Sequence, residues 1–303
     1  MYDIIIIGGG PAGLTAAVYA KRANKSVLVI EKATFGGQIT YSPKVENIPG
    51  FLSITGNEFA EKLVDQAISL GADTEFCEVT GIKNGDIKTV VTDSGEFKAK
   101  SVIIASGTRH RHLNLANEEN FIGNGISFCA VCDGAFYKDK TVAVIGGGNS
   151  ALQEALLLSD LVFKVYIVQN LDHLTGEADL CKKIADKPNI ETLVSKTVCE
   201  LTGDDSLKGI VIKDAETGEK IPLNVDGIFV AIGLEPQNDK FENVLALDDY
   251  GYSDSGEDCK TKTPGIFVAG DCRKKGIRQL TTATSDGAVA ALAACKYIDD
   301  HKV

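Results

Sequence analysis

The sequence contains no apolar stretch long enough to cross a membrane and no segment of low complexity. A membrane-spanning helix needs about 20 consecutive apolar residues, so we expect none. The N-terminus lacks the basic segment of a secretory signal peptide, because Met1-Tyr2-Asp3 leads directly into an apolar run and a glycine turn. We therefore expect a cytoplasmic protein.

Positive charge is also scarce, since 31 basic residues stand against 42 acidic ones and the formal net charge is −11. Nucleic-acid binding requires a cationic surface that neutralises phosphates. The composition therefore argues against DNA or RNA as a partner.

Close cysteine pairs are nearly absent, because only Cys129 and Cys132 of the eight cysteines form a C-x-x-C. In a cytosolic chain, cysteines are more often reduced, catalytic or metal-binding than part of a disulfide framework. A tetrahedral zinc site would need a second ligand pair, and the sequence offers none, so we predict no metal. Most of the other six are expected to be small buried side chains: Cys77, Cys181, Cys199, Cys259, Cys272 and Cys295.

The chain begins with the pattern of a nucleotide-binding βαβ unit. The apolar run Tyr2–Ile7 predicts a buried parallel strand. Gly8-x-Gly10-x-x-Gly13 follows, and residues 11–22 read as a helix. Residues 26–30 predict the next strand, which ends at the acidic Glu31.

The same pattern recurs later, and 303 residues are enough for two domains. Residues 141–145 predict a strand, Gly146-Gly147-Gly148 a turn, residues 151–161 a helix and residues 164–168 a second strand. Two such starts indicate two dinucleotide-type folds in one chain.

The first fold is expected to be interrupted by the second. Apolar strands are predicted at 101–105 and 228–232, and a last strand at Gly265–Asp271 ends in an acid. We expect an α/β protein of two Rossmann-like three-layer domains. The first comprises residues 1–112 and 242–303, and the second, residues 113–241, is inserted into it.

The first glycine motif stands in the context that makes it informative. Its first glycine permits a tight turn, the second lets the backbone approach a pyrophosphate, and the third lets helix pack on strand. The helix N-terminus offers N–H groups to the phosphates, and Glu31 would accept hydrogen bonds from a ribose. The alternative is a turn without a ligand.

Cys129-Ala-Val-Cys132 is followed by Asp133. A C-x-x-C brings two sulfurs within reach of one disulfide, and local dipoles can lower the pKa of one thiol. A neighbouring carboxylic acid can return a proton to the leaving thiolate. The alternatives are a zinc knuckle without its second pair, or a structural disulfide.

These motifs together resemble the low-molecular-weight thioredoxin reductases. The likeness runs in order over essentially the whole chain: Gly8–Gly13, Phe35–Gln38, Val45–Gly50, Cys129–Gly134 and Gly270-Asp271 with Arg278-Gln279. The resemblance implies FAD in the first domain and the redox pair on the second. It also implies a homodimer whose domains rotate, so that the dithiol alternates between flavin and thioredoxin.

The resemblance assigns roles by position. Cys132 would be the sulfur nearest the flavin, Cys129 would attack the thioredoxin disulfide, and Asp133 would donate a proton. The FAD contacts implied are Gly8, Gly10, Pro11, Ala12, Gly13 and Glu31 at the adenosine diphosphate, Gly36, Gly37, Gln38 and Asn47 along the flavin and ribityl chain, Gly270 and Asp271 at the ribityl or pyrophosphate region, and Arg278, Gln279 and Leu280 at the isoalloxazine edge.

The second glycine turn departs from the family pattern. There the following strand runs into His-Arg-Arg with a further arginine nearby, whereas this chain has Gln169 and the neutral Asn170, Leu171 and Thr175. A ribose 2′-phosphate favours bidentate guanidinium partners, and each charge-assisted hydrogen bond contributes about 1.5–3 kcal/mol. NADPH binding should therefore be weak. An NAD site would carry an acid at the strand end, and Gln169 is neutral.

The missing arginines favour a different electron donor. The sequence resembles the ferredoxin-dependent flavin thioredoxin reductases, in which a one-electron carrier reduces FAD. Such an acidic partner would need a local basic patch, and the candidates are residues 109–112 and Arg273-Lys274-Lys275 with Arg278, the second being preferred. The alternative for either group is a solvated basic face.

Other functions stay open at this point. An NAD(P)H-dependent thioredoxin reductase with an atypical nucleotide site is one, and an oxygen-using dithiol oxidase is another. A redox-sensing flavoprotein or assembly scaffold is a third. The turn at Gly146 would either be a structural relic, which we favour, or hold a second dinucleotide.

Overall fold

The computed structural model describes residues 1–42 and 45–301, which fold into two compact units. The first unit is formed by residues 1–109 and 235–303, and the second by His110–Leu234. Among the described residues, no helix is long and apolar enough to cross a membrane.

The chain passes between the units at 109/110 and 234/235 rather than after residues 112 and 241. Where the chain passes from one unit to the other, β7 (Thr108–His110) and β16 (Leu234–Pro236) pair as a two-stranded sheet. Beyond β16, the buried Asn238 amide donates to the carbonyl oxygens of Gly251 and Cys272. These bonds tie the segment after residue 234 to the first unit.

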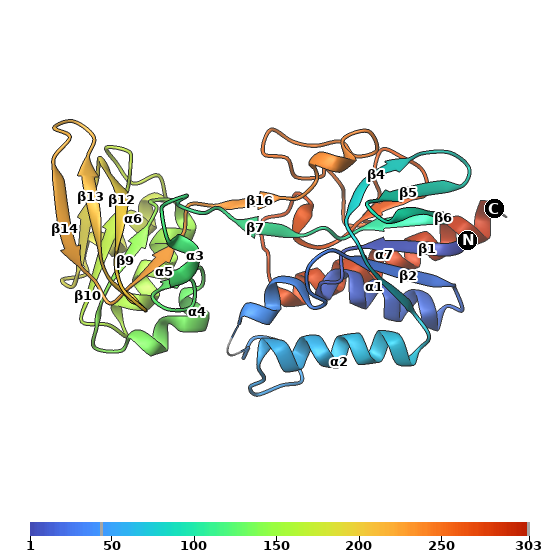
Figure 1. The fold of residues 1–303 in the computed structure, drawn as a ribbon, viewed down its shortest axis with the longest axis horizontal. Helices are drawn as coiled ribbons and strands as arrows, with labels where there is room; N and C mark the ends of the chain where they lie inside the picture. The colour runs from blue at the N-terminus through green and yellow to red at the C-terminus, as the bar shows by residue number, and fades with distance from the viewer. Residues whose placement is uncertain (43–44, 302–303) are drawn as a thin grey trace. The chain divides into compact units, whose positions relative to one another are not determined.

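The first unit is built on a seven-stranded sheet in the order β3-β2-β1-β6-β5-β4, with β17 also paired to β6. Figure 1 labels β1, β2, β4, β5 and β6 of this sheet. β1 pairs in parallel with β2 and β6, and β17 pairs in parallel with the end of β6. The strands are β1 (Tyr2–Ile7), β2 (Val27–Glu31), β3 (Asp73–Phe76), β4 (Val79–Lys83), β5 (Lys88–Thr92), β6 (Gly95–Ile104) and β17 (Ile266–Val268).

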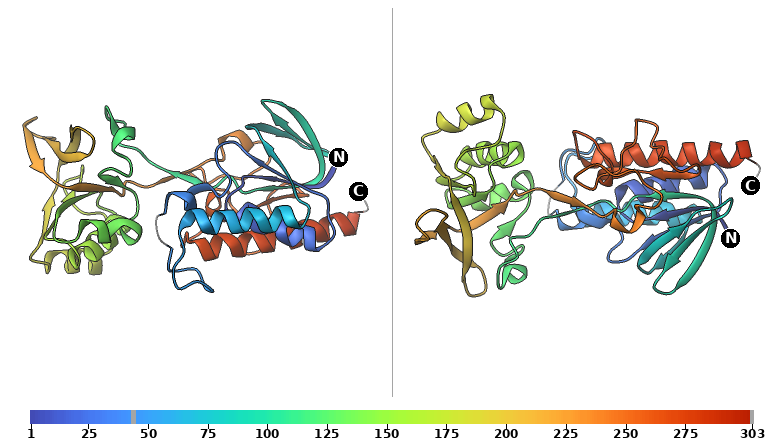
Figure 2. Two further views of the ribbon diagram at one scale, coloured as in Figure 1. Left: turned by 60° about the horizontal axis from the view of Figure 1, so that its bottom comes forward. Right: turned by 90° about the horizontal axis from the view of Figure 1, so that it is seen from above.

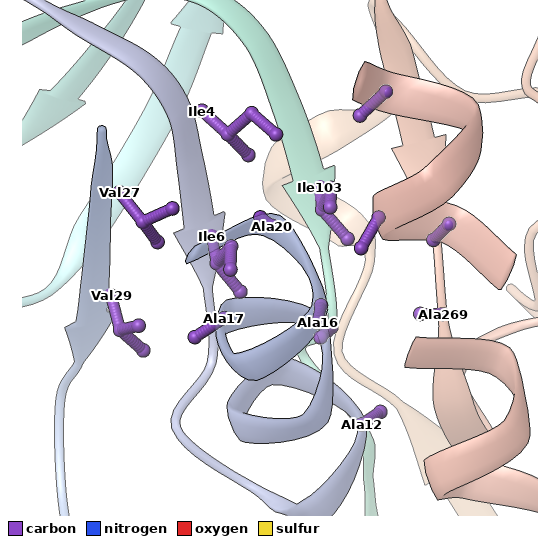
Figure 3. Close-up of a cluster of buried hydrophobic side chains, with 14 of the residues drawn as sticks. Ile4, Ile6, Ala12, Ala16, Ala17, Ala20, Val27, Val29, Ile103 and Ala269 are labelled. Atoms are coloured by element: carbon purple, nitrogen blue, oxygen red, sulfur yellow. The ribbon is translucent and has the colours of Figure 1, made fainter. Parts of the chain in front are cut away.

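Alternating side chains of β1 serve both faces of this sheet, as the period of two in a strand requires. Ile4 and Ile6 lie on the face that the helices cover. Ile5 and Ile7 lie on the opposite face, in a cluster with buried side chains of β4 and β5. Figure 3 shows Ile4 and Ile6 beside alanines of the first helix. Three helices cover that face (Figures 1 and 2): α1 (Pro11–Arg22), α2 (Gly56–Ser69) and α7 (Leu280–His301).

Small residues bring α1 and α7 close together. A Cβ on Gly287 of α7 would lie 2.1 Å from the carbonyl oxygen of Ala12 in α1. Ala16, Ala17 and Ala20 of α1 are fully buried in the same cluster. The close contact fixes α7 against the helix that follows the first glycine turn.

The second unit repeats the nucleotide-binding arrangement, with a parallel sheet in the order β11-β10-β9-β15-β8 and an antiparallel sheet β12-β13-β14. Its strands are β8 (Ile126–Ser127), β9 (Thr141–Ile145), β10 (Lys164–Val168), β11 (Ile190–Leu193), β12 (Lys196–Gly203), β13 (Leu207–Asp214), β14 (Lys220–Asn224) and β15 (Gly227–Val230). Its helices are α3 (Glu118–Phe121), α4 (Ala130–Asp133), α5 (Asn149–Ser159) and α6 (Ala178–Ala185). A short 3-10 helix, η2 (Gly134–Tyr137), also belongs to this unit. The first unit has three others: η1 (Gly37–Tyr41), η3 (Asp239–Phe241) and η4 (Gly270–Cys272).

The predicted α/β class and both βαβ starts are confirmed, and several element boundaries are corrected. The strand predicted at 101–105 is the end of the longer β6, and that predicted at 228–232 is Gly227–Val230. The helix predicted at 151–161 begins two residues earlier, because Gly148 is already its N-cap. The strand predicted at 265–271 covers only Ile266–Val268, since the left-handed Gly270 starts a 3-10 helix.

Candidate functional site

The first glycine turn is packed so tightly that side chains do not fit. Gly8 has φ +106°, and a Cβ there would lie 2.2 Å from the carbonyl oxygen of Ala105. A Cβ on Gly13 would lie 1.9 Å from the carbonyl oxygen of Gly8. Gly10 is the N-cap of α1 and Pro11 is its first residue, so the turn presents the helix N-terminus.

Glu31 closes the far side of this turn. Its Oε2 accepts from the Gly9 N–H at 2.7 Å, and its Oε1 accepts from the amides of Lys32 and Ala33 at 2.9 and 2.8 Å. A carboxylate has about four acceptor positions, so one is left for a ribose hydroxyl. A pocket beside Glu31 is lined by residues of β1, β2, β4 and the segment around Phe241.

The next predicted residues converge on the same turn. The Gly36 N–H donates to the Gly9 carbonyl oxygen at 2.7 Å, and a Cβ on Gly37 would lie 3.1 Å from the Gly10 Cα. Gln38 follows in η1. A Cβ on Gly10 would meet nothing closer than 4.0 Å, from Gly36 and Gly37, so space remains between these two glycine segments.

Residues far apart in the sequence complete the set. Asn47 Nδ2 donates to Gln279 Oε1 at 3.1 Å, and Arg278 Nε donates to the Asp271 carbonyl oxygen at 3.2 Å. A Cβ on Gly270 would lie 2.8 Å from the Ala12 Cβ. The first unit thus gathers the residues predicted to contact FAD from both ends of the chain.

The basic cluster preferred as a docking surface is largely internal, which corrects that prediction. Arg273 is buried and binds Asp286 through two hydrogen bonds, of 2.8 and 3.1 Å. Lys275 Nζ lies 3.1 Å from both Asp286 and Asp271. These cations neutralise buried carboxylates and are not available to a partner, whereas Lys274 is exposed.

Asp271 keeps an unused acceptor within this network. Lys275 makes an ion-pair contact with its Oδ1, yet that buried atom has no hydrogen-bond partner among the described residues. Burial raises the pKa of the Asp271 carboxyl, while Lys275 and Arg278 oppose the rise. A carboxyl in this state fits a polar group of a bound cofactor.

The second unit carries the redox pair as a disulfide, Cys129–Cys132, with the sulfurs 2.04 Å apart. Cys129 is the N-cap of α4, and its Sγ accepts from the Cys132 N–H at 3.2 Å. An amide donor on this sulfur favours its thiolate once the disulfide is reduced. Between the cysteines, Val131 is 71% exposed, so the turn is open on one side.

Asp133 stands beside the pair as predicted. Its Oδ2 accepts from Ser127 Oγ at 2.6 Å, and the same hydroxyl accepts from the Cys129 N–H at 3.1 Å. Burial raises the pKa of the Asp133 carboxyl, and the Ser127 hydrogen bond opposes the rise. A carboxyl with a raised pKa holds a proton better, as a general acid needs.

Two polar side chains near the pair, Ser127 and Glu154, were missed by the sequence analysis. Ser127 carries no motif of its own and is revealed only by its bonds to Cys129 and Asp133. Glu154 did leave a signal, because it lies three residues after Ala151 and four before Leu158 on a predicted helix. That spacing puts a carboxyl on the apolar side of α5.

The other six cysteines are unpaired thiols, of which Cys77, Cys259, Cys272 and Cys295 are buried. This confirms the prediction that most of them are buried small side chains. Burial and the neighbouring Asp286 raise the pKa of the Cys259 thiol to about 12, which makes it unreactive.

The second glycine turn keeps the backbone of the first with different side chains around it. Gly146 has φ +126°, and a Cβ there would lie 2.5 Å from the Ala231 carbonyl oxygen. Gln169 occupies the place of Glu31, is 4% exposed and donates from Nε2 to the His173 carbonyl oxygen at 3.3 Å. The Thr175 N–H donates to the Gly147 carbonyl oxygen at 2.8 Å.

Comparison with known proteins gives one consistent result. The family model described as pyridine nucleotide-disulphide oxidoreductase matches residues 2–287. The thioredoxin reductase of Bacillus subtilis is 40% identical over 302 residues, which cover 99% of this chain and 96% of that protein. The chain belongs to the thioredoxin reductases within this family.

Other relatives agree with that assignment. A Clostridium pasteurianum protein described as the 34.2 kDa protein in rubredoxin operon is 40% identical, with 98% of this chain and 97% of that protein covered. The crystal structure of thioredoxin reductase from Streptococcus pyogenes has a TM-score of 0.87 and 36% identity, with 99% of both chains covered.

FAD is the cofactor of this family, and the first unit fits it. Three of its features match a flavin dinucleotide: a glycine cradle that a Cβ would fill, a ribose acceptor at Glu31 and an unused buried oxygen at Asp271. Gly8, Gly10, Gly13 and Glu31 would hold its adenosine diphosphate part.

Proposed function

We propose that this chain reduces the disulfide of a thioredoxin through FAD and the Cys129–Cys132 pair, with electrons supplied by reduced ferredoxin rather than NADPH. The observation that carries the first part is the disulfide at the N-terminus of α4 beside Asp133. The curated relatives named thioredoxin reductase support thioredoxin as the substrate. The family resemblance supports a homodimer.

When bound, FAD supplies the electron pair that breaks the Cys129–Cys132 bond, and it can itself be reduced one electron at a time. Cys132 is the sulfur proposed to face the flavin. Cys129 attacks the thioredoxin disulfide, and its Sγ has the Cys132 N–H at 3.2 Å to stabilise the thiolate. Cys132 then resolves the mixed disulfide.

Asp133 returns the proton that the leaving thiolate of thioredoxin needs. Its raised pKa keeps the carboxyl protonated over a wider pH range than that of an exposed aspartate. Ser127 fixes its orientation, because one hydroxyl bonds both the carboxylate and the backbone of Cys129. The acid is therefore held in the same turn as the attacking sulfur.

The proposed donor is argued from the second glycine turn. The three positions where NADPH-binding relatives carry arginine are Asn170, Leu171 and Thr175, and residues 169–177 contain no lysine or arginine. His173 is the one basic group there, and it pairs with Asp172 at 2.5 Å. Losing three charge-assisted hydrogen bonds lowers the affinity for NADPH by several powers of ten.

The rival donor is NADPH, since the family description names pyridine nucleotides. A one-electron protein donor is favoured further by the Clostridium pasteurianum relative described from a rubredoxin operon, because rubredoxins are one-electron carriers. Part of the basic cluster expected to receive such a donor is buried, so its docking cations lie elsewhere than Arg273 and Lys275.

The test is anaerobic reduction of the purified flavoprotein by separate donors. Reduced ferredoxin should bleach the flavin and, with thioredoxin present, drive its reduction over many turnovers, while NADPH and NADH should bleach it slowly or not at all. Rapid bleaching by micromolar NADPH would overturn the ferredoxin proposal. Bleaching by a small dithiol, with peroxide formed in air, would identify a dithiol oxidase instead.

A further inference from the structure

A half-buried carboxyl, with one oxygen fully buried, lies on the helix that packs against the turn of the redox pair. Glu154 belongs to α5, and one helical turn to either side of it Ala151 and Leu158 are fully buried. Its Oε2 is buried and has no hydrogen-bond partner among the residues that the structure describes. α4 packs against α5, which brings the Ala130 N–H near this carboxyl.

Ala130 connects this carboxyl to the dithiol. It follows Cys129 directly, is 1% exposed and lies in the same apolar cluster as Ala151 and Leu158. Glu154 therefore lies beside the peptide that joins Cys129 to Ala130. Burying an ionised carboxylate is costly when it has few partners. Burial raises the pKa of Glu154 to about 7, and the nearby Ala130 N–H opposes the rise.

We propose that Glu154 is a second proton-binding group of the dithiol centre, which takes up a proton when the Cys129–Cys132 disulfide is reduced and releases it when the disulfide re-forms. The inference rests on the redox role proposed above for this pair. Reduction leaves a thiolate, and the Cys132 N–H favours that charge on Cys129. Two anions in a region of low dielectric repel, so the proton affinity of Glu154 rises.

The step balances in atoms and charge. Two electrons, from reduced flavin in the cycle or from a dithiol reductant in the test tube, break the S–S bond. One sulfur takes a proton and becomes a thiol, while Cys129 stays a thiolate. Glu154 takes a second proton from water. When Cys129 attacks a partner disulfide its charge leaves, and Glu154 returns the proton to solvent.

Other titratable groups lie on the elements packed against α5. Asp133 is the nearest competitor, because it shares α4 with the pair and also has a raised pKa. Further groups are Cys129 and Cys132 at α4, Tyr137 in η2, Lys164 and Tyr166 in β10, and Asp179, Cys181, Lys182 and Lys183 in α6. With the disulfide formed, the Glu154 pKa is shifted by burial and by Ala130, and no other titratable group of the described residues contributes to the shift.

The test is the pH dependence of the midpoint potential of the Cys129–Cys132 couple in the flavoprotein, measured by thiol trapping in dithiol buffers. The slope gives the number of protons bound per two electrons. Just above pH 7 the wild type should bind close to one proton more than Glu154→Gln, and this excess should vanish at low pH. Glu216→Gln, an exposed carboxyl between β13 and β14 of the same unit, should match the wild type.

A wild-type slope that parallels that of Glu154→Gln at every pH would overturn the inference. Infrared difference spectra of the wild type provide a second readout that does not depend on how the variant folds. Reduction should produce the carbonyl band of a newly protonated carboxyl, and absence of this band would also contradict the proposal. Neither readout uses thioredoxin or ferredoxin, so failure of the proposed function would be recognised separately.

Discussion

The two glycine turns of this chain have nearly the same backbone and very different surroundings. In the first, Gly8 N–H donates to the Ile30 carbonyl oxygen at 2.8 Å, and in the second Gly146 N–H donates to that of Val168 at 2.9 Å. Both glycines have φ above +100°. The strand, turn and helix are therefore the same supersecondary unit built twice.

The differences lie in the side chains that would choose a ligand. In the first unit, β2 ends in Glu31, whose carboxylate faces the turn. In the second unit, β10 is followed by the neutral Gln169. The third glycine, Gly13, has no room for a Cβ, and its counterpart is Ala151. In the function proposed here, a nucleotide-binding backbone persists without the groups that hold a nucleotide, and α4 carries the redox function of the second unit.

The largest expected effect separates the two turns directly. Gly13→Ala should abolish flavin binding, because its Cβ would lie 1.9 Å from the Gly8 carbonyl oxygen and push α1 away from the turn. Flavin retained per chain after purification is the measurement. Ala151→Gly is the matched change in the second turn, and it should cost about 1 kcal/mol of stability and leave the flavin content unchanged. Full flavin content in Gly13→Ala would show that the first turn does not need a glycine at this position to bind the flavin.

Loss of turnover should follow from the dithiol in the second unit. Cys129→Ser should reduce thioredoxin turnover to background and leave reduction of the flavin by its donor intact, since the attacking sulfur acts after the flavin. Anaerobic single-turnover spectra and a thioredoxin assay give the two readouts. Cys199→Ser, a change of a thiol in β12, should behave as wild type. Turnover that survives in Cys129→Ser would reassign the attacking sulfur.

A smaller but substantial effect is expected at the charge network of the first unit. Lys275→Met leaves Asp271 without its ion-pair partner and removes one of two cations from the buried Asp286. Breaking a buried pair costs about 3 kcal/mol, so both the stability of the chain and its FAD affinity should fall. Denaturant unfolding and flavin titration of the apoprotein measure these losses. Lys274→Met, at an exposed position, should change the stability and the free energy of FAD binding by less than about 0.5 kcal/mol. Equal losses in the two variants would show that Lys275 does not stabilise the buried carboxylates.

The smallest expected effect is a shift in the pH dependence of thioredoxin reduction. The folded-state pKa of Asp133 is raised by burial, so its acid form is present at low pH and is lost as pH rises through that pKa. Thioredoxin reduction should therefore fall on the alkaline side. Ser127→Ala removes the hydrogen bond that lowers this pKa, so the fall should move to higher pH. A fall that moves to lower pH in Ser127→Ala would show that Asp133 is not the acid.

Much of this arrangement was readable from local pattern. The strand Tyr2–Ile7 and helix Pro11–Arg22 were predicted with their observed ends, because an apolar run, three glycines and a proline specify them locally. Asn47 and Gln279 were both named as site residues, although their hydrogen bond joins segments far apart in the sequence.

The errors came from contacts that depend on the tertiary fold. Arg273 and Lys275 looked like surface charge because their partner, Asp286, lies on a helix whose packing the local sequence does not reveal. The sequence does not indicate a role for Glu154, because its position near the dithiol depends on Ala130. Ala130 comes near Glu154 only when α4 packs on α5. Burial and pairing of charges depend on distant partners, whereas turn geometry does not.

The proposed electron donor requires that the second glycine turn does not bind a pyridine nucleotide. Calorimetric titration of the flavoprotein with NADPH tests it most directly, with the variant carrying Asn170→Arg, Leu171→Arg and Thr175→Arg as the positive comparison. We expect no saturable binding to the wild type at micromolar NADPH and measurable binding to the triple variant. A micromolar dissociation constant for the wild type would contradict it.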